Sequence, residues 1–477
     1  MPPLTRPTLA RNIVLPPRQG LLAADTDVLV VGGGPAGLGA AVGAADSGAQ
    51  VVLAERYGFL GGNATAALVM PLMSFHTAKP PGGEPLADML LPADHGPGEA
   101  VVAGVLRRLL TRLQQLGGAI PASPRTGYTV PFDPEVFKSV ALQLLDEAGV
   151  HFLLHAFADE IVRDGGRPAV VFETKSGPLV VRAQVVVDCT GDGDVAVRAG
   201  ALHEVGRDPD GLVQPMTLMF RMVEFERDAF AGYVREHPEQ WRGVHGLWDL
   251  VQKASAAGEL DLPREDILFF ATPHSAEISV NSTRISRPQG VLGTDVWDLT
   301  YAEWEGRRQL RQIEAFLRRY VPGFERAYAV QSGTQVGIRE TRRVVGGYQL
   351  TADDILHARK FDDVVACSAY PIDIHSPKGQ GTRLQRLPPG EAYDIPLRCL
   401  VPQGVDDLLV AGRCISTTHE ALASCRIMPV AMATGHAAGV CAALAAKGGV
   451  QPREVPAVQV QRELARQGAI LRCAGQP

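Results

Sequence analysis

Two unbroken apolar runs near the start of the chain have the pattern of buried parallel strands. The first is Asp27-Val-Leu-Val-Val31 and the second is Gln50-Val-Val-Leu-Ala54. Strands that are covered on both faces of a parallel sheet show such runs instead of polar–apolar alternation. A helix of small residues lies between them and ends near Ser47-Gly48. The pattern therefore predicts a strand–helix–strand unit of about thirty residues.

Further elements follow from the same pattern. Helices are predicted from about Glu99 to Leu116 and from Asp133-Pro134 to Gly149. Asp is a favoured N-cap residue and Pro is favoured at the first helical position. Alternating short strands are predicted over 151–187, and another buried strand is predicted at Leu408-Leu-Val-Ala411.

The stretch from 211 to 330 changes character, because strand-like pieces mix there with a charged helix from Ala302 to Arg319. The strand-like pieces are Met216 to Val223, Ile267 to Phe270 and Glu277 to Val280. We interpret this stretch as an inserted domain that faces the substrate. The expected division is an N-terminal arm at 1–24, a nucleotide-binding domain in two parts at 25–210 and 336–450, a substrate or cap domain at 211–335, and a C-terminal helix and tail at 451–477. The Pro/Gly-rich loop 76–98 is expected to form a lid or a wall of the site.

Composition narrows the class of protein. The 477 residues include 46 Lys and Arg against 52 Asp and Glu, a net charge of −6, so nucleic acid is not an expected partner. The seven cysteines form no C-x-x-C pair, and no metal site is expected. The first twenty residues carry prolines where a secretion signal needs an apolar core. The apolar stretch Val430 to Ala446 is too short and too polar for a membrane span. We therefore expect a soluble, cytoplasmic protein.

The glycine motif Gly32-x-Gly34-x-x-Gly37 follows the first strand directly and opens the helix. Its glycines allow a tight turn, a close approach of the backbone to a pyrophosphate and close helix–strand packing. The N–H groups at the start of the helix can then bind phosphate. Glu55 ends the second strand, where its carboxylate can accept hydrogen bonds from ribose hydroxyls. The motif predicts a dinucleotide site but does not separate FAD from NAD.

Three later segments bear on the choice between FAD and NAD: ERYGFLGGNAT at 55–65, DCTGDGD at 188–194 and LLVAGRCISTTHEALASCRIMPVAMATGHAAG at 408–439. Together with VVGGGPAGLGAAVGAA, GIRETRRVVGGY and YPIDIH, they span most of 26–445. In these segments the chain resembles the FAD-dependent oxidoreductases of the glutathione-reductase-like flavoprotein superfamily. More narrowly, it resembles the bacterial FAD-dependent oxidoreductase family that is distantly related to the fumarate reductase and succinate dehydrogenase flavoproteins.

The resemblance implies an α/β fold, with a Rossmann-like FAD-binding domain (a parallel sheet with a β-meander) and an inserted α+β substrate or cap domain. It implies FAD as the cofactor, and we expect the FAD to be bound non-covalently. The helix that begins near Pro429 should direct its positive end at the flavin and stabilise the reduced form. The implied cofactor-binding residues are Gly32, Gly34, Pro35, Ala36, Gly37, Glu55, Arg56, Gly61, Gly62, Asn63, Thr65, Thr190, Gly191, Asp192, Gly412, Arg413, Met428 and Pro429.

The reacting groups are expected in the polar segments 337–343 and 370–375. Arginine suits carboxylate recognition because its donors form a rigid fork, so Arg339, Arg342 and Arg426 are candidates for holding an anionic substrate or the flavin. His375 is the candidate acid/base. His419 either lines the same cavity or is an N-cap or buried hydrogen-bonding group.

The resulting functional hypothesis is an FAD-dependent oxidoreductase, a dehydrogenase or reductase, that transfers a hydride between a small organic substrate and the flavin N5. The alternatives are a flavin-binding protein with a non-redox or structural flavin and a flavin monooxygenase. Neither an obvious second nucleotide motif nor the DG motif of the monooxygenases is present, which disfavours the monooxygenase. The electron donor or acceptor and the oligomeric state are left open.

Overall fold

A seven-stranded sheet forms the centre of one large part of the computed structural model, which describes residues 13–78, 90–91, 98–208, 210–377 and 381–471. The strand order is β3-β2-β1-β6-β5-β4, and β19 also pairs with β6. The bounds are β1 Leu21–Val31, β2 Val51–Ala54, β3 His151–Leu153, β4 Phe157–Asp164, β5 Arg167–Thr174, β6 Gly177–Asp188 and β19 Leu408–Val410.

Two kinds of pairing meet on β6. Strands β1 and β19 pair with it in parallel, while β4, β5 and β6 form an antiparallel meander. Strands β2 and β3 extend the parallel part beyond β1. The α/β class with a parallel sheet and a β-meander is therefore confirmed. Because β1 begins at Leu21, the last residues of the expected arm 1–24 pair with β6 instead of lying free.

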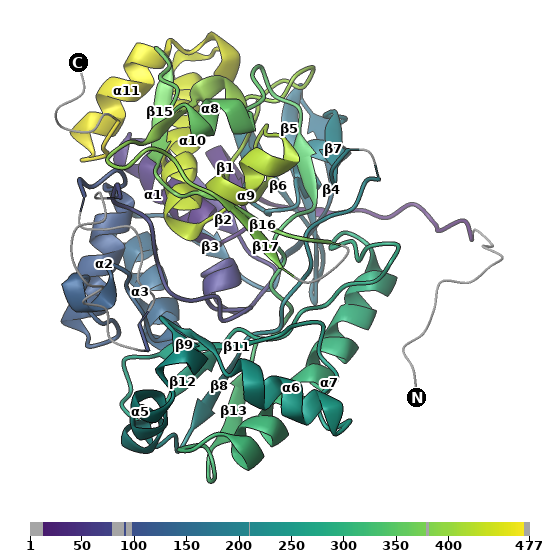
Figure 1. Cartoon of the computed structure of the whole chain (residues 1–477). Helices are drawn as coiled ribbons and strands as arrows, with labels where there is room; N and C mark the ends of the chain where they lie inside the picture. Colours follow the sequence, from purple (N-terminus) through teal and green to yellow (C-terminus); the bar gives the residue numbers. More distant parts are fainter. Residues whose placement is uncertain (1–12, 79–89, 92–97, 209, 378–380, 472–477) are drawn as a thin grey trace.

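Helices α1 (Pro35–Asp46) and α10 (Met428–Gly448) lie side by side in the centre of the molecule (Figure 1). Their axes approach closely because glycines face the other helix. A Cβ atom added at Gly39 would lie 2.2 Å from the carbonyl oxygen of Met432, and one added at Gly439 would lie 2.0 Å from that of Ala40. The small-residue composition of both helices thus has a packing reason.

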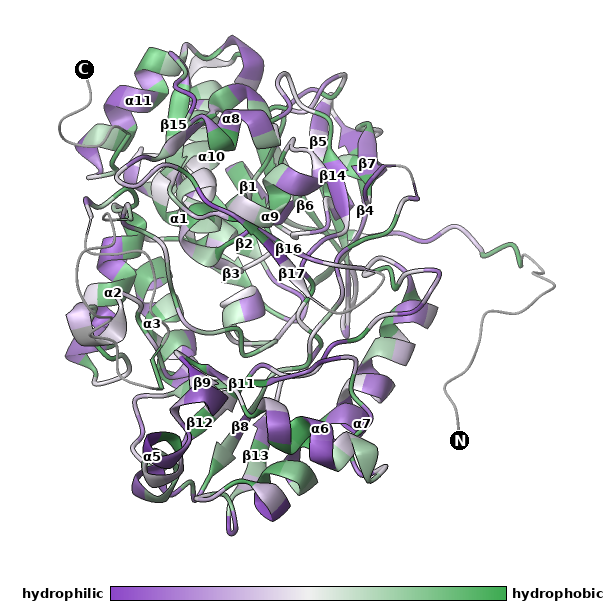
Figure 2. Cartoon of the chain, in the orientation of Figure 1, coloured by the Kyte–Doolittle hydropathy of each residue, from purple (hydrophilic) through white to green (hydrophobic). Residues whose placement is uncertain are grey.

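The stretch Val430 to Ala446 lies within helix α10, which is long and apolar enough to cross a membrane, so the prediction that this stretch is too short and too polar is wrong. However, 83% of the most apolar stretch of the helix is buried inside the protein. It is therefore a core helix of this fold. Figure 2 shows how inner and outer elements differ in hydropathy. The inner strand β1 is green (hydrophobic), whereas the outer helix α11 (Ala457–Arg466) has much purple (hydrophilic).

Helix α2 is Val105–Gln115 and helix α3 is Pro134–Glu147. The predicted start of α3 is confirmed, since Asp133 accepts hydrogen bonds from the N–H groups of Glu135 and Val136. The predicted start of α2 at Glu99 is wrong by six residues. Ala100 forms a β-bridge with His76, and Gly104 has a φ of 63°, so helical geometry begins only after it.

A second, antiparallel sheet with the order β13-β8-β12-β11-β10-β9 and three helices form the other large part, in the lower half of Figure 1. Their bounds are β8 Phe220–Val223, β9 Trp241–Arg242, β10 His245–Gly246, β11 Ile267–Ala271, β12 Ile278–Val280, β13 Tyr328–Ser332, α5 Arg227–Glu236, α6 Trp248–Ala256 and α7 Val296–Tyr320. This part has its own apolar core around Phe230, Phe269 and Phe324. Helix α7 starts six residues before the predicted Ala302 because Asp295 caps it.

Short elements complete the described chain. They are α4 Asp194–Arg198, β7 His203–Val205, β14 Arg342–Val344, α8 Ala352–Leu356, β15 Val364–Ser368, β16 Ile372–His375, β17 Thr382–Gln385, β18 Tyr393–Pro396 and α9 His419–Cys425. Strands β7 and β14, β15 and β18, and β16 and β17 form three antiparallel pairs. Most of the loop 76–98, the expected lid, lies outside the described residues.

Candidate active site

One cleft of about 1740 Å³, part of it open to solvent, is lined by residues from both large parts of the structure. Many of the predicted cofactor-binding residues lie in its wall: Gly32, Gly34, Pro35, Ala36, Glu55, Arg56, Gly62, Asn63, Thr190, Gly191, Gly412, Arg413, Met428 and Pro429. Four others, Gly37, Gly61, Thr65 and Asp192, lie outside that lining. Of the predicted catalytic residues, Arg339, His375 and Arg426 line the cleft.

The glycine turn after β1 is shaped for a close approach of backbone to ligand. Gly32 has a φ of 100°, and a Cβ atom on it would lie 2.5 Å from the carbonyl oxygen of Cys189. A Cβ atom on Gly37 would lie 1.8 Å from the carbonyl oxygen of Gly32. Gly34 is the N-cap residue of α1 and supplies no side-chain cap, so the first N–H groups of the helix remain available to an anion.

Glu55 lies at the end of β2 and holds this turn. Its Oε2 accepts a hydrogen bond of 2.7 Å from the N–H of Gly33, and its Oε1 accepts one of 3.0 Å from the N–H of Tyr57. Burial raises the pKa of Glu55, and these two hydrogen bonds oppose that rise. The remaining lone pairs of the carboxylate can still accept hydrogen bonds from ligand hydroxyls.

Asp192 lies outside the lining of the cleft but contacts a residue that belongs to it. Asp192 is buried and pairs with Arg413 at 2.9 Å, and the hydroxyl of Thr341 donates to it at 2.7 Å. Thr65 similarly donates to the carbonyl oxygen of Leu60 at 2.7 Å, beside the Gly61–Gly62 turn. These residues therefore position their neighbours in the lining, and their own contacts are internal.

The N-terminus of α10 also lies at the cleft. Ile427 is the N-cap residue, it gives no side-chain hydrogen bond, and the first turn contains no acidic residue. Met428 and Pro429 of this turn line the cleft. The positive end of this long helix thus has no side-chain cap and no acidic residue in its first turn, all of which lies within the described residues. Together with the glycine turn and Glu55, this arrangement fits an FAD with its pyrophosphate at α1 and a developing negative charge at α10.

A polar cluster, defined by Arg339, Asp373, His375 and Arg426, forms another part of the lining. Nε2 of His375 lies 3.4 Å from Oδ2 of Asp373, and Nη2 of Arg426 lies 3.6 Å from the same oxygen. The hydroxyl of Tyr370 donates to this oxygen at 3.1 Å. Asp373 is therefore shared by three neighbours in the cluster.

Arg339 is held differently. Its Nη1 donates to the carbonyl oxygen of Pro215 at 2.7 Å and to the hydroxyl of Thr217 at 2.6 Å. In the part of the chain that the structure describes, no carboxylate lies within ion-pair distance of Arg339. Burial and the neighbouring Arg426 cation lower the pKa of Arg339 to about 9, so it is still charged at neutral pH. A partly buried charge without an ion-pair partner is costly, and an anionic ligand would compensate it.

The titration properties of the cluster favour a neutral histidine. Burial and the Arg339 cation lower the pKa of His375 to about 4. Burial opposes the ionisation of Asp373, but its contacts with His375, Arg426 and Tyr370 hold its pKa well below the usual range. At neutral pH the cluster thus contains two guanidinium cations, one carboxylate and a neutral imidazole.

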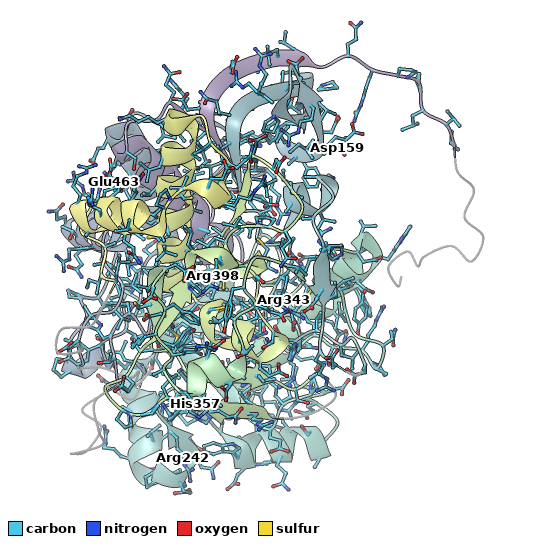
Figure 3. The ribbon with its side chains drawn as sticks, turned by 90° about the horizontal axis from the view of Figure 1, so that it is seen from above. Asp159, Arg242, Arg343, His357, Arg398 and Glu463 are labelled. Atoms are coloured by element: carbon cyan, nitrogen blue, oxygen red, sulfur yellow. The ribbon has the colours of Figure 1, made fainter. Side chains whose placement is uncertain are left out.

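The three arginines of the segment 337–343 have three different environments. Arg339 faces the cleft, whereas Arg342 lies outside its lining and pairs with Asp194, next to Asp192. Arg343 is buried in the central part of the molecule, where Figure 3 labels it, and pairs with Glu340 at 2.6 Å. Glu340 also contacts Nδ1 of buried His419 at 2.9 Å, which is the second of the two alternatives for that histidine.

Sequence reasoning did not single out several residues of the lining. Asp373 and Tyr370 belong to the segment YPIDIH, but only its histidine was proposed as a reacting group. Thr217, Met219 and Asn281 come from the inserted part, and nothing in their local sequence signals a site. That Pro215 and Thr217 supply hydrogen-bond acceptors for partly buried Arg339 is visible only in the folded structure.

Comparisons with known proteins were made for the sequence and for the structure. No curated protein matches the chain. Among solved structures, it is similar to the anhydrotetracycline hydroxylase OxyS of Streptomyces rimosus, with 12% identity, a TM-score of 0.45 and coverage of 93% of this chain and 66% of that one. The chain thus spans just under two thirds of that hydroxylase's length.

Two further solved structures are similar at the same level. A geranylgeranyl bacteriochlorophyll reductase-like protein of Thermoplasma acidophilum shares 12% identity, with a TM-score of 0.42 and coverage of 94% of this chain and 84% of that one. The p-nitrophenol 4-monooxygenase of Pseudomonas putida DLL-E4 shares 11% identity, with a TM-score of 0.43 and coverage of 93% and 89%.

The sequence of residues 27–464 matches a protein family described as FAD dependent oxidoreductase. This match includes the glycine turn, Glu55, the polar cluster and both helices whose N-termini lie at the cleft. FAD is the cofactor of the family, and the residues of the cleft fit it. The chain therefore belongs to the FAD dependent oxidoreductase family.

Proposed function

We propose that this protein is a dehydrogenase or reductase that transfers a hydride between a small organic anion and its FAD. The observation that carries the proposal is the polar cluster, in which partly buried Arg339 has no carboxylate within ion-pair distance among the described residues, while His375 lines the same cleft. An oxidoreductase of this kind needs one group that holds the substrate and one that exchanges its proton.

Arg339 is the group that holds the substrate. Its contacts with Pro215 and Thr217 fix the guanidinium in one orientation and leave its charge uncompensated. A guanidinium of this kind suits a carboxylate, because both are planar and can form two parallel hydrogen bonds. Arg426 adds a second positive charge, which Asp373 partly balances.

His375 is the group that exchanges the proton. Its pKa of about 4 keeps the imidazole neutral at pH 7, so it can accept a proton from a substrate hydroxyl or amine. When bound, FAD supplies the site that accepts a hydride from the substrate or donates one to it. The reaction then needs a separate electron donor or acceptor to regenerate the flavin.

An anaerobic titration tests this proposal. FAD-loaded protein is mixed with a panel of 2-hydroxy acids, amino acids and dicarboxylates, each paired with its neutral amide, for example lactate with lactamide. We expect one carboxylate class to bleach the flavin absorption bands and its amide to leave them unchanged. Bleaching by amides and acids alike would contradict the anionic substrate. Flavin bands that resist the whole panel would favour a non-redox flavin or a monooxygenase instead.

A further inference from the structure

An apolar wall of the cleft lies next to Arg339. It is defined by five residues that all line the cleft: Val69, Met70, Met73, Met219 and Ile338. Their side chains are aliphatic or thioether groups, which donate no hydrogen bond. Two of them, Val69 and Met73, are partly exposed, so a ligand in the cleft can contact them.

The neighbours of Arg339 place this apolar wall beside the cation. Arg339 donates a hydrogen bond of 2.6 Å to the hydroxyl of Thr217, and Met219 follows two positions later in the same lining. A Cβ atom added at Gly337, two positions before Arg339, would lie 3.5 Å from Cγ2 of Val69. The guanidinium and the apolar wall therefore lie next to each other in the cleft.

This arrangement favours a ligand with a single charged end. A carboxylate on Arg339 gains charge-assisted hydrogen bonds. A second carboxylate against the apolar wall would lose its hydration and find no donor there in return. A hydrocarbon chain in the same place is stabilised, because its surface is removed from water. Methionine side chains are unbranched and flexible, so Met73 and Met219 can adapt to the shape of such a chain.

We propose that the substrate is a monocarboxylate with an apolar body, and that Met73 and Met219 are specificity-determining residues that contact this body. This inference rests on the proposed function, in which Arg339 holds the substrate carboxylate. It narrows the substrate class from small organic anions in general to hydrophobic acids, and it disfavours dicarboxylates and sugar acids.

Binding is tested without turnover, by titration calorimetry of FAD-loaded protein with butanoate, hexanoate and octanoate. These saturated acids carry no hydroxyl or amino group to be oxidised. We expect the Kd to fall about fourfold for each added methylene group, the effect of burying that group. Hexanedioate, with a carboxylate in place of the methyl end, should bind about tenfold more weakly than hexanoate. A Kd that does not change with chain length, or equal binding of hexanedioate and hexanoate, would overturn the proposal.

The residues of the apolar wall are tested by Met73→Gln and Met219→Gln, which keep the unbranched shape but add a polar amide. We expect the fall in Kd to shrink to about twofold or less per methylene group in these variants, and Met73→Leu to retain the wild-type value. Leu202→Gln is the matched control, because Leu202 is 64% exposed and lies outside the lining.

The same variants show whether the apolar wall contacts the flavin instead of the substrate. In that case Met73→Gln and Met219→Gln would weaken FAD binding and leave the chain-length dependence unchanged, and the proposal would be wrong.

This proposal and the proposed function fail in different ways. If a hydroxy or amino carboxylate bleaches the flavin while the Kd values do not depend on chain length, the apolar body is wrong and the reaction stands. If the chain-length dependence is found and is lost in Met73→Gln, yet no carboxylate of matching length bleaches the flavin, the binding site stands and the hydride transfer is wrong.

Discussion

Glu55 accepts a 2.7 Å hydrogen bond from the backbone N–H of Gly33, so the acid at the end of β2 holds the glycine turn that follows β1. The carboxylate lines the cleft and is 5% exposed. One side chain thus links the shape of the glycine turn to the position where we expect the ribose of FAD. We therefore expect FAD binding to be sensitive even to the replacement of this carboxylate by an amide.

Glu55→Gln is expected to weaken FAD binding by about tenfold, since a hydrogen bond to a charged group contributes about 1.5 kcal/mol or more. The measurement is a titration of FAD-free protein with FAD, followed by quenching of flavin fluorescence. Glu147→Gln, at the exposed end of α3, is the control and should leave the affinity unchanged. Equal affinities of both variants would show that Glu55 does not contact the cofactor.

Gly439→Ala is expected to lower the free energy of unfolding by about 1–3 kcal/mol, the usual cost of overpacking a core. The added methyl group would lie 2.0 Å from the backbone carbonyl oxygen of Ala40, so α1 and α10 would have to separate. Gly448→Ala in the last turn of α10 is the control, because its nearest neighbour is Val450 Cγ2 at 3.4 Å. Urea unfolding measures both, and similar values for the two variants would refute the close-packing account.

Arg339→Gln is expected to raise the KM for a carboxylate substrate by about 100-fold, with a smaller change in kcat, because a charge-assisted pair shielded from water by the bound substrate contributes about 2–5 kcal/mol. Arg342→Gln provides the comparison. Arg342 contacts Asp192 and Asp194 behind the dinucleotide side of the cleft, so its loss should weaken FAD binding and leave the substrate KM nearly unchanged. If Arg342→Gln raised the substrate KM and Arg339→Gln weakened FAD binding instead, the roles assigned to the two arginines would be wrong.

The pH dependence of flavin reduction follows from the lowered pKa of His375. Burial and Arg339 hold this pKa near 4, below the ordinary 6.5, so the base is already free at neutral pH. The rate should therefore stay level from pH 8 to about 5 and fall as the pH drops through about 4. In Arg339→Gln the repelling cation is gone, and the fall should move to higher pH. A wild-type midpoint near 6.5 would contradict this environment for His375.

The same shift has a consequence for stability. The unfolded chain takes up a proton at His375 near pH 6.5, while the folded chain does so only near pH 4. This contribution to stability is therefore present above pH 6.5 and is lost as the pH falls toward 4.

The glycine turn and Glu55 in the wall of the cleft were predictable because their sequence signals are local. The unbroken run before Gly32, the glycine spacing and Glu55 lie within thirty positions, and each has a direct backbone consequence in the structure. The first residue of α2, by contrast, could not be predicted from local sequence. Its start depends on the bridge between Ala100 and His76, which are 24 positions apart.

The polar cluster shows the limit more clearly. Arg339 and Arg342 stand three positions apart in one arginine-rich segment, yet only Arg339 faces the cleft. What separates them is Thr217 and Pro215 in one case and Asp194 in the other, all more than 120 positions away along the chain. The residue types predicted that an arginine of this segment faces the cleft. Only the tertiary contacts show that it is Arg339 and not Arg342.

The most direct test of the account is single-turnover flavin reduction by wild type and His375→Gln, side by side, without oxygen. Both proteins should be purified with FAD bound, and the absorption spectrum measures the FAD content before mixing. The account predicts that a carboxylate substrate bleaches the flavin in the wild type and does so about 100-fold more slowly in the variant. Equal rates in the two proteins, with equal FAD content, would contradict it.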